Sequence, residues 1–310
     1  MTKVTRAHDV LTVGTKPSAP RGARGFVHSA YPLWGYLPAA VVYLVFFALP
    51  AFASFYFSLT RWTLFDVEFI GLDNFRAFFT QPRLYSALTH TLIYGFITSG
   101  AKVVLGLGLG VFLTSQVIGR NFLRSVIFFP TLISTIGIGI TFSAILDPYD
   151  GLLNRTLAGI GVNGPAWLTD PQLALFTVAG IDVWKGLGIA SLIYVAGLVA
   201  IPREFYEAAR VDGAGGWKQF WTITWPLVRP ASVTVIILSL TSGLRSFDLI
   251  WATTGGGPGF ASDVIASVIY KQYQAGFYGL STAGNVVLFI VVIAVMAPVQ
   301  LLLYRRETER

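Results

Sequence analysis

The sequence contains no cysteine and few residues that ligate metals. Without cysteine among its 310 residues, it has neither a disulfide framework nor a thiolate metal site. Its three histidines, His8, His28 and His90, form no metal-ligand pattern such as His-Glu-x-x-His. The chain also lacks the Gly-x-x-x-x-Gly-Lys-Ser/Thr phosphate-binding loop and the Gly-x-Ser-x-Gly nucleophile turn. We therefore expect no catalytic, metal or cofactor site in this chain.

Charged residues are also scarce. They make up 12% of the chain, whereas soluble domains carry about 25%. Hydrophobic residues make up 54%, and the mean hydropathy is +0.66. Most of the chain is therefore expected to lie in lipid. The formal net charge of +7 is typical of nucleic-acid-binding as well as membrane-facing proteins. We assign it to loops that face the cytoplasm, and we expect no nucleic-acid partner.

Long apolar stretches account for this composition. Six of them meet the length of about 20 residues that a membrane-spanning helix needs. Lipid offers the backbone no hydrogen-bond partner, and no alternating pattern indicates barrel strands, so these stretches are expected to be helices. The sequence thus predicts an all-α membrane protein with six transmembrane helices, over residues 33–58, 88–117, 123–146, 172–200, 230–254 and 279–304.

The basic residues of the loops predict the orientation of these helices. Most lie before residue 33, between the second and third stretches, between the fourth and fifth, and after residue 304. The positive-inside rule places these segments and both termini in the cytoplasm. Residues 1–32 are then a disordered cytoplasmic arm, 33–304 the transmembrane domain and 305–310 a cytoplasmic tail. The first stretch is longer than a signal-peptide core, so we expect no cleavage after Ala53.

Glycine recurs within the second stretch, at Gly106, Gly108 and Gly110. Small residues four apart let two membrane helices approach each other closely. We therefore expect this face of the helix to pack on another helix.

The longest predicted cytoplasmic loop, residues 202–229, has features of two short helices. Pro202 suits a helix start, and Glu204 and Glu207 suit its first turns, where negative charge complements the helix dipole. Gly213 suits the end of this helix or the close approach of another backbone. A second apolar helix follows, ends near Pro226 and contains Phe220, Trp221 and Trp225. Both helices are expected at the inner membrane surface, free to dock on a partner.

This loop resembles the EAA motif of ABC-importer permeases. That motif reads Glu-Ala-Ala, three residues, Gly, nine residues, Ile, one residue, Leu-Pro. Here Glu207-Ala208-Ala209 is followed after three residues by Gly213, and nine residues later by Ile223-Thr224-Trp225-Pro226. Trp225 stands where Leu is usual and keeps the position apolar.

Three further segments resemble the carbohydrate-uptake branch of this family. They are Phe69-Ile70-Gly71-Leu72-Asp73-Asn74-Phe75, Asp212-Gly213-Ala214 and Thr253-Thr254-Gly255-Gly256-Gly257-Pro258-Gly259. The resemblance covers nearly the whole chain after residue 32. It implies the ABC type I importer permease fold, in the six-helix form typical of disaccharide, oligosaccharide and glycerol-3-phosphate importers.

The resemblance also implies a function and partners. The chain would be a sugar-transport subunit without its own ATPase site, working by alternating access in a bacterial or archaeal cytoplasmic membrane. ATP and magnesium would bind a partner ATPase dimer. Other partners would be a second permease, membrane lipid and an extracellular solute-binding protein that docks on residues 60–87, 147–171 and 255–278. The residues implied in coupling to the ATPase are Glu207, Ala208, Ala209, Asp212, Gly213, Ile223 and Pro226.

Ionisable residues inside spans are costly and mark candidate functional positions. Asp182 and Lys185 lie three residues apart, on one helix face, and so do Arg245 and Asp248. Each pair either lines a polar cavity or forms an internal salt bridge. Lys102 is isolated in the sequence, and we expect it to serve helix packing. Resemblance to maltose-type permeases places substrate contacts beside the EAA loop, which adds Trp184, Gly186, Ser242, Ser246 and Phe247.

Two alternatives remain. One is an ABC permease for a non-sugar solute, against which the Asp-Gly-Ala segment and the Gly-Gly-Pro turn favour carbohydrate. The other is an ion-coupled secondary transporter. Such transporters are commonly built from internal repeats with broken helices, and the sequence shows no convincing repeat.

Overall fold

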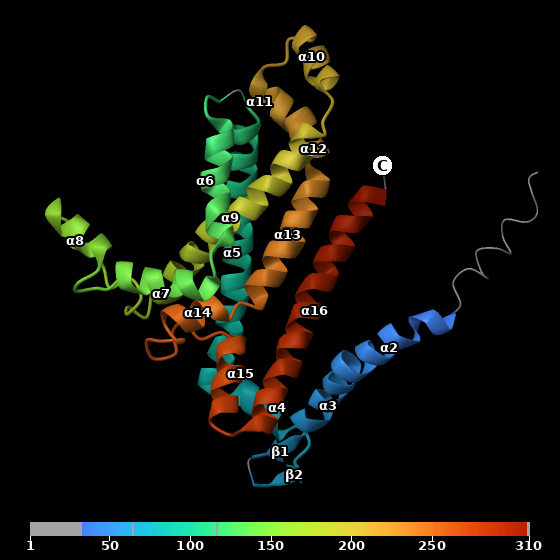
Figure 1. The fold of residues 1–310 in the computed structure, drawn as a ribbon, viewed down its shortest axis with the longest axis vertical. Helices are drawn as coiled ribbons and strands as arrows, with labels where there is room; N and C mark the ends of the chain where they lie inside the picture. The colour runs from blue at the N-terminus through green and yellow to red at the C-terminus, as the bar shows by residue number, and fades with distance from the viewer. Residues whose placement is uncertain (1–32, 64, 116, 309–310) are drawn as a thin grey trace, which may run out of the picture. The chain divides into compact units, whose positions relative to one another are not determined.

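The computed structural model describes residues 33–63, 65–115 and 117–308. This part of the chain is helical except for its loops and one two-stranded sheet (Figure 1). The predicted arm, residues 1–32, lies outside the described residues, as do the last two residues of the predicted tail. The chain divides into two compact units, one up to Phe52 and one from Ala53 onward, and each is described by itself.

The first unit is a run of short helical segments. η1 spans Leu33–Tyr36, α2 spans Leu37–Tyr43, η2 spans Leu44–Ala48, and α3 (Leu49–Ser58) begins in this unit and continues into the next. η2 has π-helical geometry and ends two residues before Pro50. Proline has no N–H and its ring collides with the carbonyl four residues earlier, and the wider π turn accommodates both effects.

A small hairpin opens the second unit. β1 (Thr60–Trp62) pairs antiparallel with β2 (Val67–Phe69), with Thr60 opposite Phe69. The following helix α4 (Asp73–Thr80) carries the buried Asn74, whose side-chain amide donates to the carbonyls of Ser58 and Thr60 at 2.9 and 2.8 Å. These two bonds fix α4 on the hairpin, and neither the hairpin nor α4 was predicted.

Four helical segments among the described residues are long and apolar enough to cross a membrane. They are Trp34–Ser58, α5 (Pro82–Thr114), α9 (Ala174–Val199) and, within α16 (Tyr278–Thr308), Tyr278–Leu303. Two bent pairs raise this to as many as six if each pair is one span. The pairs are α6 (Arg120–Leu132) with α7 (Thr135–Ile145), bent by 98°, and Gly216–Leu227 with α13 (Arg229–Leu244), bent by 64°.

Two of the six stretches that were predicted to be continuous helices are interrupted in the structure. Residues 123–146 are divided between α6 and α7 at Ile133 and Ser134, whose backbones leave the helical conformation three and four residues after Pro130. Residues 230–254 are divided between α13 and α14 (Asp248–Thr253) at residues 245–247. Hydropathy averaged over a whole stretch does not reveal such breaks, because the apolar segments on either side outweigh the few polar residues at each break, such as Ser134 and Arg245. The remaining helices outside these spans are α8 (Leu152–Gly159), α10 (Arg203–Val211) and α15 (Ile265–Gln274).

The central contact of the second unit is between α5 and α9 (Figure 1). A Cβ atom placed on Gly106 would lie 2.9 Å from the Cβ of Ala190, and one on Gly110 would lie 2.6 Å from the Cβ of Tyr194. Side chains at these positions would push the two helices apart. The predicted packing face is confirmed for Gly106 and Gly110, whereas Gly108 faces open space.

A buried ion pair crosses the same contact. Lys102 Nζ lies 2.7 Å from Asp182 Oδ2, and the two side chains are 6% and 19% exposed. Lys102 is thus not isolated, and Asp182 does not form a salt bridge with Lys185. The sequence did not predict this pair, because spacing along the chain reveals only partners on the same helix. Lys102 and Asp182 are 80 positions apart.

We predict that Asp182→Asn strongly destabilises the protein, because it leaves the Lys102 ammonium buried and unpaired. Removing one partner of a buried pair costs about 3–5 kcal/mol. The double variant Lys102→Met/Asp182→Leu removes both charges and is expected to recover most of this loss. The readout is the unfolding temperature of the purified chain in mild detergent.

The matched control is Arg155→Gln, which breaks the exposed Arg155–Asp150 pair and is expected to change stability little. Equal unfolding temperatures for Asp182→Asn and the unsubstituted protein would contradict the prediction.

Candidate coupling surface and substrate pathway

The predicted EAA segment forms a short exposed helix, α10 (Arg203–Val211), preceded by Pro202. No residue of α10 is buried. The helix ends in a Schellman motif: the N–H of Ala214 donates to Ala209 O at 2.8 Å, and the N–H of Gly213 donates to Arg210 O at 3.1 Å. Gly213 has φ +75°, a conformation that glycine adopts without strain. The predicted helix end at Gly213 is confirmed.

A second helical segment returns from α10 toward the membrane spans. It consists of α11 (Gly216–Gln219), η3 (Phe220–Thr224) and α12 (Trp225–Leu227), and η3 is π-helical. Tyr206 Oη and Thr224 Oγ1 lie 3.0 Å apart and join this segment to α10. The predicted pair of short helices is confirmed, and the second ends one residue after Pro226.

The predicted coupling residues differ in accessibility. Glu207, Ala208, Asp212 and Gly213 are exposed, and Ala209, Ile223 and Pro226 are half-buried. Ile223 packs on the core between α5 and α9. The exposed set includes large apolar side chains as well, since Phe205 is 52% and Val211 89% exposed. The loop therefore presents a mixed charged and apolar surface, since Arg203 and Arg210 are exposed beside the two glutamates, and its second segment anchors that surface to the membrane helices.

The predicted pathway residues fall into three places. Gly186 and Ser242 line a cavity of about 110 Å³ together with Lys102 and Ser239. Gly186 leaves room for Lys102, because a Cβ there would lie 2.5 Å from Lys102 Cε. This first place lies where α5, α9 and α13 meet.

The second place involves α7. Trp184 packs edge-on against Phe142, with ring centroids 5.3 Å apart, and both line an open apolar cavity of about 500 Å³. Lys185 donates to Thr135 Oγ1 at the start of α7. Asp182 and Lys185, predicted to act together, thus have partners on different helices.

The third place is the break between α13 and α14, which contains Arg245, Ser246 and Phe247. Arg245 and Asp248 are both exposed, and no ion pair joins them in the described structure. Phe247 stacks on Trp251 (centroids 5.7 Å apart) and meets Tyr270 edge-on at 5.3 Å. Neither Trp251 nor Tyr270 was predicted for the pathway. The sequence did carry a signal for Trp251, because it lies four residues after Phe247, a spacing that places two side chains on one helix face.

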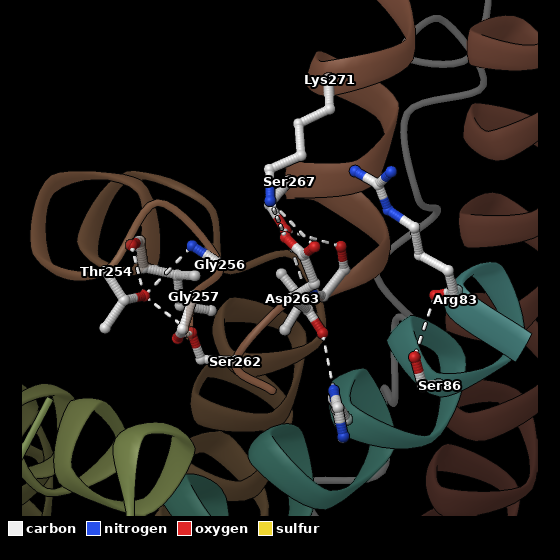
Figure 2. Close-up of polar contacts among 12 residues, drawn as sticks. Arg83, Ser86, Thr254, Gly256, Gly257, Ser262, Asp263, Ser267 and Lys271 are labelled. Atoms are coloured by element: carbon white, nitrogen blue, oxygen red, sulfur yellow. Dashed lines mark hydrogen bonds and ion pairs between the residues drawn. The ribbon is translucent and has the colours of Figure 1, made fainter. Parts of the chain in front are cut away.

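A buried carboxylate organises the loop after α14 (Figure 2). Asp263 is fully buried, and its oxygens accept from Lys271 Nζ at 2.7 and 2.9 Å and from Ser267 Oγ at 2.8 Å. Its backbone carbonyl lies 3.0 Å from His90 Nδ1 on α5. Nearby, Arg83 Cζ lies 3.8 Å from the ring centroid of Phe260. Ser267 and Lys271 follow Asp263 by four and eight residues. This regular spacing was a sequence signal for their contact, and the sequence interpretation missed it.

The loop after α7 is ordered by a second carboxylate. Asp147 Oδ1 accepts from the N–H groups of Asp150 and Tyr149 at 2.8 and 2.9 Å. These two bonds favour the ionised form and lower the pKa of Asp147. Farther along, Trp167 Nε1 donates to Asn154 Oδ1 at 2.8 Å. The loops around Asp147 and Asp263 therefore have defined conformations.

Comparisons with known proteins agree with this architecture. The solved structure of a bacterial ABC transporter involved in the import of alginate contains a chain that superposes with a TM-score of 0.76, covering 91% of this chain and 96% of that one at 23% identity. This likeness shows the fold, that of an ABC type I importer permease.

Two relatives are similar in sequence over most of their length. The trehalose/maltose transport system permease protein MalF of Thermococcus litoralis is 34% identical, over 83% of this chain and 88% of the relative. The arabinooligosaccharides transport system permease protein AraP of Bacillus subtilis is 34% identical, over 92% and 93%. Residues 102–308 also match the sequence model of one family. The chain is therefore a member of the family of binding-protein-dependent transport system inner membrane components.

Proposed function

We propose that this chain is the membrane permease subunit of an ATP-driven importer for a di- or oligosaccharide or a sugar-like solute. The observation that carries the proposal is the exposed α10 with its EAA sequence, in a chain that belongs to this transport family. The names of the two relatives, which concern trehalose, maltose and arabinooligosaccharides, support sugar as the solute class. An external binding protein would deliver the solute.

The proposed topology has six spans with both termini in the cytoplasm. It counts each bent pair, α6–α7 and Gly216–α13, as one span. α10 then lies on the cytoplasmic side, and the loops around Asp147 and Asp263 lie outside, where the binding protein would dock. The basic residues around α10 support this orientation.

In the proposed coupling step, α10 inserts into a partner ATPase. Glu207 would meet a basic side chain, and Ala208 would permit close packing. Closure of the ATPase dimer around ATP would move α10, and the segment Gly216–Leu227 would carry the motion to α13. The Tyr206–Thr224 contact supports this route because it joins α10 to that segment.

In the proposed pathway, the solute passes the break between α13 and α14. The aromatic rings of Phe247, Trp251 and Tyr270 offer apolar faces for sugar rings, and the exposed Arg245 offers a planar set of donors for hydroxyls or an anionic group. Trp184, at its separate cavity, would serve a different stage of passage.

Purification tests the assignment as a whole. We predict that the tagged chain, gently solubilised from its own membrane, recovers a second permease and an ATPase, identified by mass spectrometry. A binding protein is expected when solute and a non-hydrolysable ATP analogue are added. Recovery of the chain alone across several mild detergents would favour an ion-coupled transporter instead.

Glu207→Lys is predicted to uncouple ATP hydrolysis from uptake, because it reverses the charge that meets the ATPase. In proteoliposomes containing the complete transporter, solute uptake is expected to fall at least tenfold while the complex remains assembled. Glu204→Lys makes the same charge change one turn earlier on α10 and is expected to have a smaller effect. Undiminished uptake by Glu207→Lys would refute the coupling role.

Trp251→Leu is predicted to lower uptake several-fold while leaving the basal ATPase rate unchanged, because it removes a ring from the aromatic cluster and keeps an apolar side chain. Tyr273→Leu is the matched control, since Tyr273 is 58% exposed and packs on Tyr278 instead. Equal effects of the two substitutions on uptake would argue against solute contact at the break.

A further inference from the structure

Three arginines line a polar cavity beside α10 and the segment Gly216–Leu227, the proposed coupling segments. The cavity has a volume of about 570 Å³ and lies among the ends of α5 and α9 and the starts of α6 and α10. Arg120 and Arg124 enter from α6, and Arg203 enters from α10. Thr114, Ser115, Tyr206 and Thr224 add polar groups to its wall. This site is separate from the predicted pathway residues.

The arginines have no carboxylate partner in the part of the chain that the structure describes. Arg124 is half-buried, and its Nη2 donates to the carbonyl of Leu113 at 3.0 Å. Its Nε is buried and finds no acceptor among the described residues. Three arginine side chains without a carboxylate partner in the described structure give the cavity a positive charge that an anion would neutralise.

An apolar groove of about 340 Å³ adjoins the cavity. Its walls are one face of α5, from Val103 to Val111, and the rings of Phe220, Trp221 and Trp225. Val111 lines both the groove and the polar cavity. η3 also borders both, since its Thr224 lines the cavity and its Phe220 and Trp221 line the groove. The cavity and the apolar groove therefore share Val111 and η3 as walls.

We propose that this composite site binds an anionic phospholipid, with its phosphate among Arg120, Arg124 and Arg203 and an acyl chain along α5. From Val111 to Val103 the groove follows α5 for about 12 Å at 1.5 Å per residue, which suits the upper part of an acyl chain. Basic pockets between membrane helices are typical binding sites for anionic headgroups. The groove distinguishes a lipid from a free phosphate, which would need only the cavity.

The binding site joins α6 to two elements of the proposed coupling route, α10 and η3. Arg203 begins α10, Arg120 and Arg124 belong to α6, and the groove lies against η3. A bound lipid would hold these three elements together. The inference does not depend on which solute is transported, and its test measures lipid binding alone.

The test is native mass spectrometry of the purified full chain in detergent, titrated with phosphatidylglycerol or with phosphatidylcholine of the same acyl chains. We expect one phosphatidylglycerol to bind more tightly than phosphatidylcholine. Arg120→Gln/Arg124→Gln should weaken phosphatidylglycerol binding by at least tenfold, since each basic residue near an anionic lipid contributes about 1 kcal/mol, or about fivefold. Arg229→Gln, on the same proposed face but outside the cavity, should leave binding unchanged.

A second pair of variants tests the groove. Trp221→Ala should weaken phosphatidylglycerol binding, and Trp217→Ala should not, because Trp217 is 76% exposed and does not line the groove. Equal retention of the two lipids, or unchanged binding by the double arginine variant, would overturn the proposal. Displacement of the lipid by millimolar inorganic phosphate would also overturn it and assign the arginines to a free phosphate.

Discussion

The contact between α5 and α9 is the constraint on which the rest of the second unit depends. Two glycines let the helix backbones approach closely, and the Lys102–Asp182 pair fixes their register. α6 packs on α9, and α13 packs on both helices. The Ser99–Ser239 contact, with oxygens 2.8 Å apart, adds a polar link from α5 to α13. The proposed coupling segments, α10 and Gly216–Leu227, and all three groups of predicted pathway residues are positioned by these helices.

Features that depend on local sequence could be predicted. Pro202 and Gly213 mark the start and end of α10 because their backbone preferences operate within a few residues. The glycine spacing in α5 indicated a packing face for a similar reason, since two glycines four apart share one side of a helix. Hydropathy located the apolar stretches because lipid imposes the same requirement along each of them.

Features that depend on tertiary partners could not be predicted. Asp182 and Lys185 share a helix face, but the carboxylate turns to α5 and the ammonium to α7. Sequence spacing does not indicate which neighbouring helix lies opposite. The breaks after α6 and α13 were missed because the apolar segments on either side dominate the hydropathy of each stretch, although Arg245 and Ser246 stand at the second break. Only Phe247 of the aromatic cluster was identified, since Tyr270 comes from α15 and meets Phe247 through the fold.

The loop held by Asp263 has a consequence for the kinetics of association. Its carboxylate, the ammonium of Lys271 and the Ser267 hydroxyl are already in contact in the isolated chain. A macromolecule that meets this face therefore encounters a shape that exists before contact, and little loop entropy is lost on binding. Encounters of this kind are close to rigid-body docking, in which the rate is set by orientation and diffusion instead of by folding of the loop. One buried carboxylate thus favours fast association of any macromolecule that docks on this face.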